Sequence, residues 1–214
     1  MKIGIMVEGQ EGLTWERWFA VAGQVEAFGL DSLWRSDHFF SVMGRTERES
    51  LEAWVSLTAL AQKTTRIGFG PLVSPMTFRH PALLARMAAA VDRLASGRLT
   101  LGIGVGCNEA DPAAYGITLP PPKEPIDRLV EGISVIPALL QGGPVVLAGR
   151  LYPLVGATRT PPPSPMPLLP NAPTSTLRSS ASRILPPGPC TRACACSATV
   201  CWHRGQCPKA SRST

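Results

Sequence analysis

Residues 65–73 read TRIGFGPLV, residues 98–105 read RLTLGIGV, and a helical pattern separates the two runs. Both runs are short and apolar, which is typical of buried strands. Pro81 suits the first turn of the helix between them, and Gly97 suits the position just beyond its end. A strand, a helix and a second strand in this order predict a β-α-β unit with parallel strands.

The same alternation extends outward from this unit. Buried strands are expected over residues 2–7 and 31–35, and Thr14 and Ser50 are expected to cap two helices. With a last helical pattern near residues 126–140, the chain contains four strand-helix units of roughly 35 residues each. The helices are expected to bury the residues that recur at helical spacing: Trp15, Trp18, Ala22, Val25, Leu51, Trp54, Leu57, Ala61, Leu84, Met87, Val91, Leu94, Ile126, Leu129, Ile133, Ile136 and Leu140.

The strands lack strict alternation, so a parallel sheet covered by helices is expected. Two α/β architectures fit, an open doubly wound sheet and the first half of a (β/α)8 TIM barrel. The run Gly102 to Gly106 does not match a dinucleotide fingerprint, because the sixth position of the motif is Cys107 and the run ends the fourth strand. A complete barrel needs roughly 250 residues, and this chain has 214.

Charge and composition change abruptly after Ala157. Residues 1–157 have a net charge of −1, whereas residues 158–214 hold seven Lys and Arg, no acid, half of the 22 prolines and five of the six cysteines. The second segment has no hydrophobic period, so it lacks the apolar surface that offsets the entropy of ordering. We expect an α/β domain over residues 1–157 and a basic, low-complexity, disordered tail over residues 158–214.

Three interpretations of the tail compete. Its arginines are scattered singly, so a nucleic-acid arm is not favoured. Its cysteines and His203 lack a paired C-x2-C spacing, so no metal site is expected. The favoured hypothesis is a reading-frame shift in a GC-rich gene, because such a shift yields Pro, Ala, Arg, Ser, Thr and Cys without periodicity.

The sequence also bears on membranes and export. No apolar run reaches the roughly 18 residues that a membrane span requires. The N-terminal run reaches Glu8 without a long apolar segment, which is not typical of a signal peptide. We therefore expect a cytoplasmic protein with no membrane partner.

Candidate chemistry gathers where strands end, because ligands bind at the carboxyl ends of the strands in both architectures. Asp37 and His38 follow the second strand, and Phe39 comes directly after them. A carboxylate beside an imidazole predicts a proton-transfer or anion-stabilising site. The alternative, in which Asp37 caps the loop and His38 packs against Phe39, stays open. After the fourth strand, Asn108 and Glu109 either bind a ligand or cap the next turn.

At these residues the chain resembles a known family. Residues 31–39, DSLWRSDHF, are similar to the second-strand signature of the luciferase-like monooxygenases, most of all the branch that uses the deazaflavin coenzyme F-420. The resemblance covers about residues 1–157, and its further motifs follow in the family's order: Gly70–Pro75, Thr77–Pro81, Gly97–Gly106, Ala113–Ile117 and Arg128–Gly132.

The resemblance implies a (β/α)8 barrel that binds coenzyme F-420, or FMN as the alternative, at its C-terminal face. The implied activity is hydride or oxygen chemistry on a small organic substrate, by an oxidoreductase or monooxygenase. His38 is then the catalytic acid or base, and Asp37 contacts the edge of the flavin ring. The Leu72–Val73 bond lies where the family often has a non-proline cis peptide that supports the ring.

The loop after the fourth strand completes the implied cofactor site. Cys107, Asn108 and Glu109 lie where the family contacts the ring or side chain of the cofactor. Cys107 is also a departure, since many relatives carry Trp there. Pro137 inside the last helix is a second departure, because it removes a backbone donor.

The resemblance ends at Ala157, which predicts a truncated or frameshifted copy. Four units leave the inner strand faces and two sheet edges uncovered, so we expect the chain alone to bind no cofactor tightly. An alternative is a non-catalytic half-barrel that self-associates or uses its basic tail as an interaction module. A third reading, an α/β hydrolase or phosphate binder, lacks a nucleophile motif.

Overall fold

A computed structural model describes residues 2–106, 108, 110–121 and 124–158, and the backbone of residues 177–180 and 199–204. Cys107, Glu109 and most of the tail lie outside the described residues. The helices are α1 (Trp15–Ala27), α2 (Ala53–Lys63), α3 (Pro81–Leu94), α4 (Ala110–Ala114) and α5 (Glu124–Gln141). The strands are β1 (Gly4–Val7), β2 (Ser32–Arg35), β3 (Gly68–Pro71), β4 (Ser74–Pro75), β5 (Thr100–Gly104), β6 (Val145–Leu147), β7 (Leu154–Ala157), β8 (Leu177–Ser180) and β9 (Thr199–Arg204).

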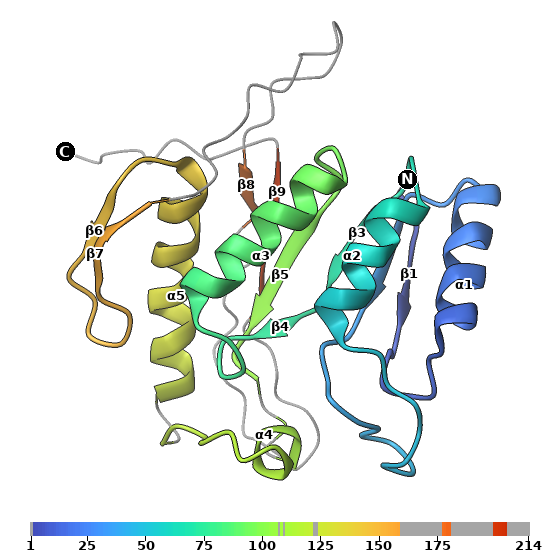
Figure 1. Ribbon diagram of the computed structural model, residues 1–214, viewed down its shortest axis with the longest axis horizontal. Helices are drawn as coiled ribbons and strands as arrows, with labels where there is room; N and C mark the ends of the chain where they lie inside the picture. The colour runs from blue at the N-terminus through green and yellow to red at the C-terminus, as the bar shows by residue number, and fades with distance from the viewer. Residues whose placement is uncertain are drawn as a thin grey trace, which may run out of the picture.

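The strands of the predicted units lie side by side in chain order. β1 pairs with β2 and β2 with β3, all parallel, and β4 pairs with β5 in the same sense. A parallel bridge between Phe69 and Leu99 joins β3 to β5. A doubly wound sheet reverses its strand order at a switch point, and this succession does not, so it fits a segment of a barrel. Helices α1, α2, α3 and α5 cover one face of the strands (Figure 1).

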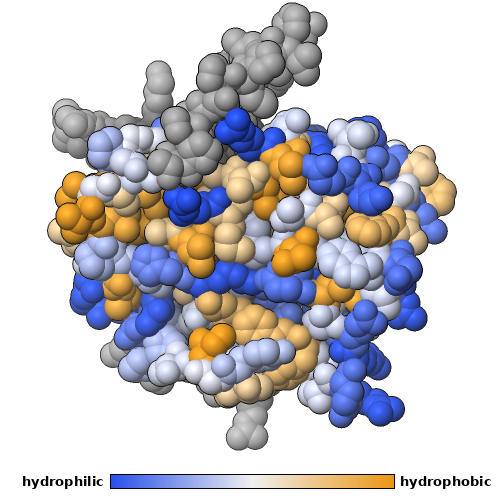
Figure 2. Space-filling view, in the orientation of Figure 1, coloured by the Kyte–Doolittle hydropathy of each residue, from blue (hydrophilic) through white to orange (hydrophobic). Residues whose placement is uncertain are grey.

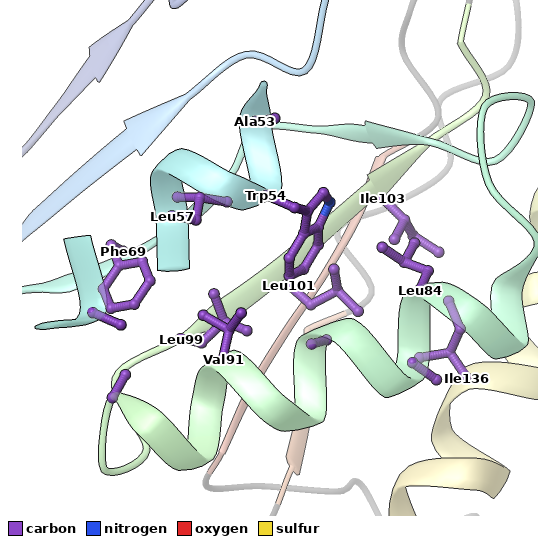
Figure 3. Close-up of a cluster of buried hydrophobic side chains, with 14 of the residues drawn as sticks. Ala53, Trp54, Leu57, Phe69, Leu84, Val91, Leu99, Leu101, Ile103 and Ile136 are labelled. Carbon is purple, nitrogen blue, oxygen red and sulfur yellow. The ribbon is translucent and has the colours of Figure 1, made fainter. Parts of the chain in front are cut away.

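The core lies between this helical layer and the strands. Trp54 of α2 points toward β5, where Leu101 lies beside it (Figure 3). Leu84, Ile103 and Ile136 meet where α3, β5 and α5 converge, and all three are fully buried (Figure 3). With Trp18, Ala22 and Val25 of α1 also buried, the core contains residues from all four predicted helix patterns, as their spacing indicates.

Helix starts were predicted with mixed success. Thr14 is confirmed as the N-cap of α1, because its side chain accepts a hydrogen bond from the Arg17 backbone. The prediction for Ser50 is wrong, since α2 begins at Ala53 and Glu52 is its N-cap. The Glu52 carboxylate accepts a hydrogen bond from the Val55 N–H at 2.7 Å, and this bond selects the later start.

Several positions expected inside are exposed. The run over residues 2–7 was expected to be buried, but β1 exposes Ile5 and Met6, because β1 is an edge strand among the described residues. Leu94 and Ile126, at the ends of α3 and α5, are also exposed. The apolar stripe of a helix loses contact with the sheet near the helix ends, so a spacing pattern alone overestimates burial there.

Two features of the second half were not predicted. β6 and β7 form an antiparallel hairpin beside α5, and Figure 2 shows a hydrophobic area over it, where Val146 and Val155 are exposed. In the tail, β8 pairs with β9 and β9 pairs with β5, both antiparallel. Within the described residues, none of the helices has the length and apolar content that crossing a bilayer would take.

Candidate functional site

Backbone hydrogen bonds hold the carboxyl ends of the strands together. The Ser36 N–H donates to the Val7 carbonyl at 3.2 Å, and the Leu72 N–H donates to the Arg35 carbonyl at 2.8 Å. The Met76 N–H donates to the Gly104 carbonyl at 2.9 Å. These bonds place the loops that follow the strands at one end of the sheet, where α4 also lies (lower end of Figure 1).

Arg35, at the last position of β2, is fully buried beneath these loops. Its guanidinium donates to the Leu51 carbonyl at 2.9 Å, to the Ser36 carbonyl at 2.9 Å and to the Ser56 hydroxyl. Burial lowers the pKa of Arg35 to about 10, and the charge of Asp37 opposes that shift. Gly9 lies so close to this guanidinium that a Cβ there would collide with it, so the loop after β1 also depends on Arg35.

Asp37 lies in a buried ion pair. Its carboxylate accepts hydrogen bonds from two Arg79 nitrogens, at 2.5 and 3.1 Å, and from the Ser74 hydroxyl at 2.7 Å. Arg79 also donates to Glu52, the N-cap of α2, at 2.7 Å. Burial works against the charge of Arg79, but Asp37 and Glu52 outweigh it and raise the pKa of Arg79. Asp37 therefore connects the loop after β2 with β4 and the loop that follows it, and the geometry favours an indirect role in shaping the site. Its contact with a flavin ring stays a prediction.

His38 meets a carboxylate that was not singled out from the sequence. Its Nδ1 lies 2.5 Å from Oδ2 of Asp111, in α4. Asp111 is fully buried, and its other oxygen, Oδ1, has no hydrogen-bond partner among the described residues. The His38 side chain is 28% exposed, so the ring is reachable from outside. The two residues are 73 positions apart in the chain, which explains why no local pattern could pair them.

Aromatic rings close one side of the site. Phe39 stacks on Phe78 with ring centres 4.6 Å apart, and Tyr115 meets Phe39 edge-on at 4.9 Å. The alternative in which His38 packs against Phe39 is not the arrangement observed, since Phe39 packs with these two rings while His38 bonds to Asp111. The cluster anchors the end of α4 to the loops after β2 and β4.

The peptide bond between Leu72 and Val73 is cis, which confirms that expectation. Leu72 is 39% exposed at the end of β3 and presents apolar surface at the same end of the sheet as His38. The roles of Leu72 and Val73 in binding a cofactor stay predictions.

The loop after β5 is described only in part. Asn108 caps the next turn, since its side-chain oxygen accepts a hydrogen bond from the Ala110 N–H at 3.1 Å. Cys107 and Glu109 lie outside the described residues, and their predicted contacts with a cofactor stay predictions. The neighbouring Gly106 has a φ of +80°, and a Cβ there would collide with the Thr77 hydroxyl. This turn therefore requires glycine.

An apolar groove of about 500 Å³ lies elsewhere, between α2 and α3. Trp54, Val55, Met87 and Leu94 line it, and Glu52 is the charged member of its lining. The groove lies on the helical side of the sheet and lacks the convergent polar groups that a reaction requires. The strand ends, with His38 and Asp111, are the better candidate for chemistry.

Comparison with known proteins identifies the family. The luciferase-like monooxygenase family matches residues 1–178. The chain belongs to this family. The matched region extends beyond Ala157, where the composition changes.

Curated members of the luciferase-like family are similar to part of the chain. The F420-dependent glucose-6-phosphate dehydrogenase of Kineococcus radiotolerans is 38% identical over 141 residues, which are 65% of this chain and 41% of that protein. The 4-hydroxyprotoasukamycin monooxygenase of Streptomyces nodosus subsp. asukaensis is 31% identical over 131 residues, 61% of this chain and 33% of that protein. The chain thus spans about two fifths or less of these relatives.

Solved structures of luciferase-like type share the fold. An F420-dependent secondary alcohol dehydrogenase in complex with an F420-acetone adduct has a TM-score of 0.67 at 24% identity, over 76% of this chain and 49% of that one. An F420-dependent tetrahydromethanopterin reductase from Methanopyrus kandleri has a TM-score of 0.61 at 24% identity, over 73% and 45%. The predicted barrel-type α/β architecture is confirmed at the level of fold, whereas the domain boundary at Ala157 stays a prediction.

Proposed function

We propose that this luciferase-like chain serves an oxidoreductase that uses coenzyme F-420, with FMN as the alternative, on a small organic substrate. The observation that carries the proposal is the His38–Asp111 pair at the carboxyl ends of parallel strands, in a chain of this family. Relatives named for F-420 dependence make the deazaflavin the first choice.

The residues present fit the ring end of such a cofactor. Leu72 offers a half-exposed apolar surface where β3 ends, and the His38 imidazole is partly exposed at the same end of the sheet. The unpartnered Oδ1 of Asp111 is an additional buried acceptor. A flavin-type ring is a flat group with polar edges, so it requires apolar contact on its face and few polar groups at its rim.

The cofactor, when bound, supplies the hydride or oxygen chemistry. Within the chain, His38 holds or accepts a proton at the strand ends, and Asp111 orients it. Leu72 and Val73 exclude water from one side. The Asp37–Arg79 ion pair keeps the loops after β2 and β4 in place around them.

The test is a cofactor titration followed by NMR on the uniformly ¹⁵N-labelled chain. At millimolar F-420, amide signals of His38, Leu72, Val73 and Asn108 are expected to shift, while those of α1 stay in place. Parallel fluorescence titrations with F-420 and FMN are expected to show no saturation at micromolar cofactor, because the described strands surround the site on one side only. Shifts spread over α1, or none at the strand ends, would contradict the proposal.

A pair of variants makes this test specific. Leu72→Asp puts a carboxylate on the half-exposed apolar surface and is expected to abolish the shifts at the strand ends. Val155→Asp makes the same kind of change at a side chain that is 92% exposed on the β6–β7 hairpin, and is expected to leave the shifts unchanged. Saturable micromolar binding would uphold the site and overturn the expectation of weak affinity.

A second candidate function is non-catalytic self-association. It is favoured by the exposure of Ile5 and Met6 in β1, an edge strand among the described residues, and of Ile3 just before it. A mass that rises with concentration and no cofactor-induced shift at the strand ends would favour this candidate over the oxidoreductase.

A further inference from the structure

We propose that Asp111 is a positioning residue that holds His38 as the Nδ1–H tautomer and leaves Nε2 as the atom that exchanges protons. The inference rests on the proposed function for the use made of Nε2. The tautomer itself is a property of the chain and requires no cofactor.

The chemistry of the two side chains defines the direction of the hydrogen bond between them. Nδ1 of His38 lies 2.5 Å from Oδ2 of Asp111, which is short for a bond between a ring nitrogen and a carboxylate oxygen. An ionised carboxylate has no proton to give and only accepts. The proton in this contact therefore belongs to Nδ1. A neutral imidazole carries one ring proton, so Nε2 is left bare and able to accept one.

The surroundings of Asp111 indicate that the hydrogen bond to His38 is the main interaction of its carboxylate. The residue is fully buried, yet its Oδ1 has no hydrogen-bond partner among the described residues. A buried carboxylate with a purely structural role is normally surrounded by several donors. Asp37 shows that pattern in this chain, with two nitrogens of Arg79 and the hydroxyl of Ser74 around it. Asp111 instead directs its bonded oxygen at a histidine.

The two faces of the His38 ring differ in access. Nδ1 is covered by the fully buried carboxylate, whereas the side chain as a whole is 28% exposed. Nε2 is therefore the ring nitrogen left for a ligand. His38 can therefore exchange a proton with a ligand through Nε2 and not through Nδ1.

A second contact holds Asp111 in place independently of His38. Tyr115, just after α4, packs edge-on against Phe39, the residue that follows His38. Phe39 in turn stacks on Phe78. α4 is thus attached to the loop after β2 at two points, and the aromatic contact keeps the carboxylate within reach when the hydrogen bond opens.

The experiment measures the ring nitrogens of His38 by ¹⁵N NMR in the full chain, at a pH where the imidazole carries one proton. The chain has three histidines, so the spectrum of His38→Gln assigns the signals. We expect the Nδ1–H tautomer to exceed the Nε2–H tautomer by at least about tenfold, as a charge-assisted hydrogen bond requires. A wild-type His38 that is mainly Nε2–H would overturn the proposal without any variant.

Variants separate positioning from general stability. Asp111→Ala is expected to reverse the ratio in favour of Nε2–H. The matched control is Asp92→Ala, which removes another buried aspartate, one that accepts a hydrogen bond from the Leu99 N–H. It is expected to leave the His38 tautomer unchanged. An unchanged ratio in Asp111→Ala, or equal changes in both variants, would overturn the proposal.

The outcome is distinguishable from failure of the proposed function. A predominant Nδ1–H tautomer without any cofactor-induced shift at the strand ends would reject the oxidoreductase and uphold the role of Asp111. Cofactor-induced shifts with a predominant Nε2–H tautomer would support the oxidoreductase and reject the role of Asp111.

Discussion

Asp37 and Arg79 form an ion pair in which the side chains are 1% and 11% exposed. Removing one partner of such a pair leaves the other charge buried without a counter-charge. The free-energy cost of that unpaired charge is larger than the net stabilisation that the intact pair provides. Arg79→Met is expected to lower the free energy of unfolding by about 3–5 kcal/mol, measured by urea denaturation. The control is Arg45→Met, because Arg45 and Glu47 form an ion pair whose side chains are 84% and 72% exposed; no measurable change is expected there. Equal effects of the two variants would contradict the buried-pair interpretation.

His80 links pH to stability at a single residue. Burial lowers the pKa of His80 below its ordinary 6.5, and the charge of Arg128 on α5 adds to the shift. Its Nδ1 accepts the Ala82 N–H and so caps α3, which requires the unprotonated nitrogen. The folded state thus prefers neutral His80. The contribution of the His80 cap to the free energy of unfolding is complete above pH 6.5, the pKa of the unfolded chain. This contribution is lost as the pH falls through the lower pKa that His80 has in the folded state.

The measurement compares wild type with His80→Asn, a residue that also caps helices but does not titrate. The loss of unfolding free energy on acidification below pH 6.5 is expected to be smaller in the variant. Arg128 on α5 acts on His80 through its charge, and the Tyr152 ring packs edge-on against the imidazole. Both residues are present in both proteins, so their effects cancel in the difference. Identical pH profiles would refute the assignment.

At the scale of elements, two glycines with opposite surroundings test how closely the strands pack. A Cβ on Gly70 in β3 would collide with the Thr100 carbonyl of β5, a backbone group that cannot rotate away. Gly70→Ala is therefore expected to cost about 3 kcal/mol or more. Gly23 in α1 has no atom within 4 Å of the added Cβ, so Gly23→Ala is expected to stabilise by about 1 kcal/mol. Thermal unfolding of both variants checks the pair, and a harmless Gly70→Ala would show that β3 and β5 leave room for a Cβ between Gly70 and the Thr100 carbonyl.

At the scale of the whole molecule, the exposed edge of the sheet predicts self-association. Ile5 and Met6 of β1 are each 38% exposed, and Ile3, just before this strand, is 47% exposed. Edge strands with apolar side chains pair readily with other chains. Light scattering is expected to show a mass that increases with protein concentration. Ile5→Lys is expected to reduce this increase, because a lysine on an edge strand opposes pairing.

Val155→Lys provides the control for this prediction. Val155 is more exposed than Ile5, at 92%, but lies on the β6–β7 hairpin. The variant is expected to associate as wild type does. A constant monomer mass in wild type, or an effect of Val155→Lys equal to that of Ile5→Lys, would locate the association elsewhere or exclude it.

Much of the fold could be predicted because its signals are local. The order of strands and helices, the Thr14 cap and the helix that begins at Pro81 all follow from residues within one or two turns of each other. The position of His38 at a strand end follows from the same local patterns. The short helix α4 and the β6–β7 hairpin were missed, because neither has enough residues to form a clear hydrophobic period.

The sequence by itself determined the β-α order, the break in composition after Ala157 and, through motifs in register, the family expectation that residues 1–178 then met. Only the tertiary structure decided which charges meet. Asp37 pairs with Arg79, which is 42 residues away in the chain, and His38 bonds to Asp111, which is 73 residues away. Helical and strand periods describe how one segment folds, whereas these pairs depend on how loops from separate units pack at the carboxyl end of the same sheet.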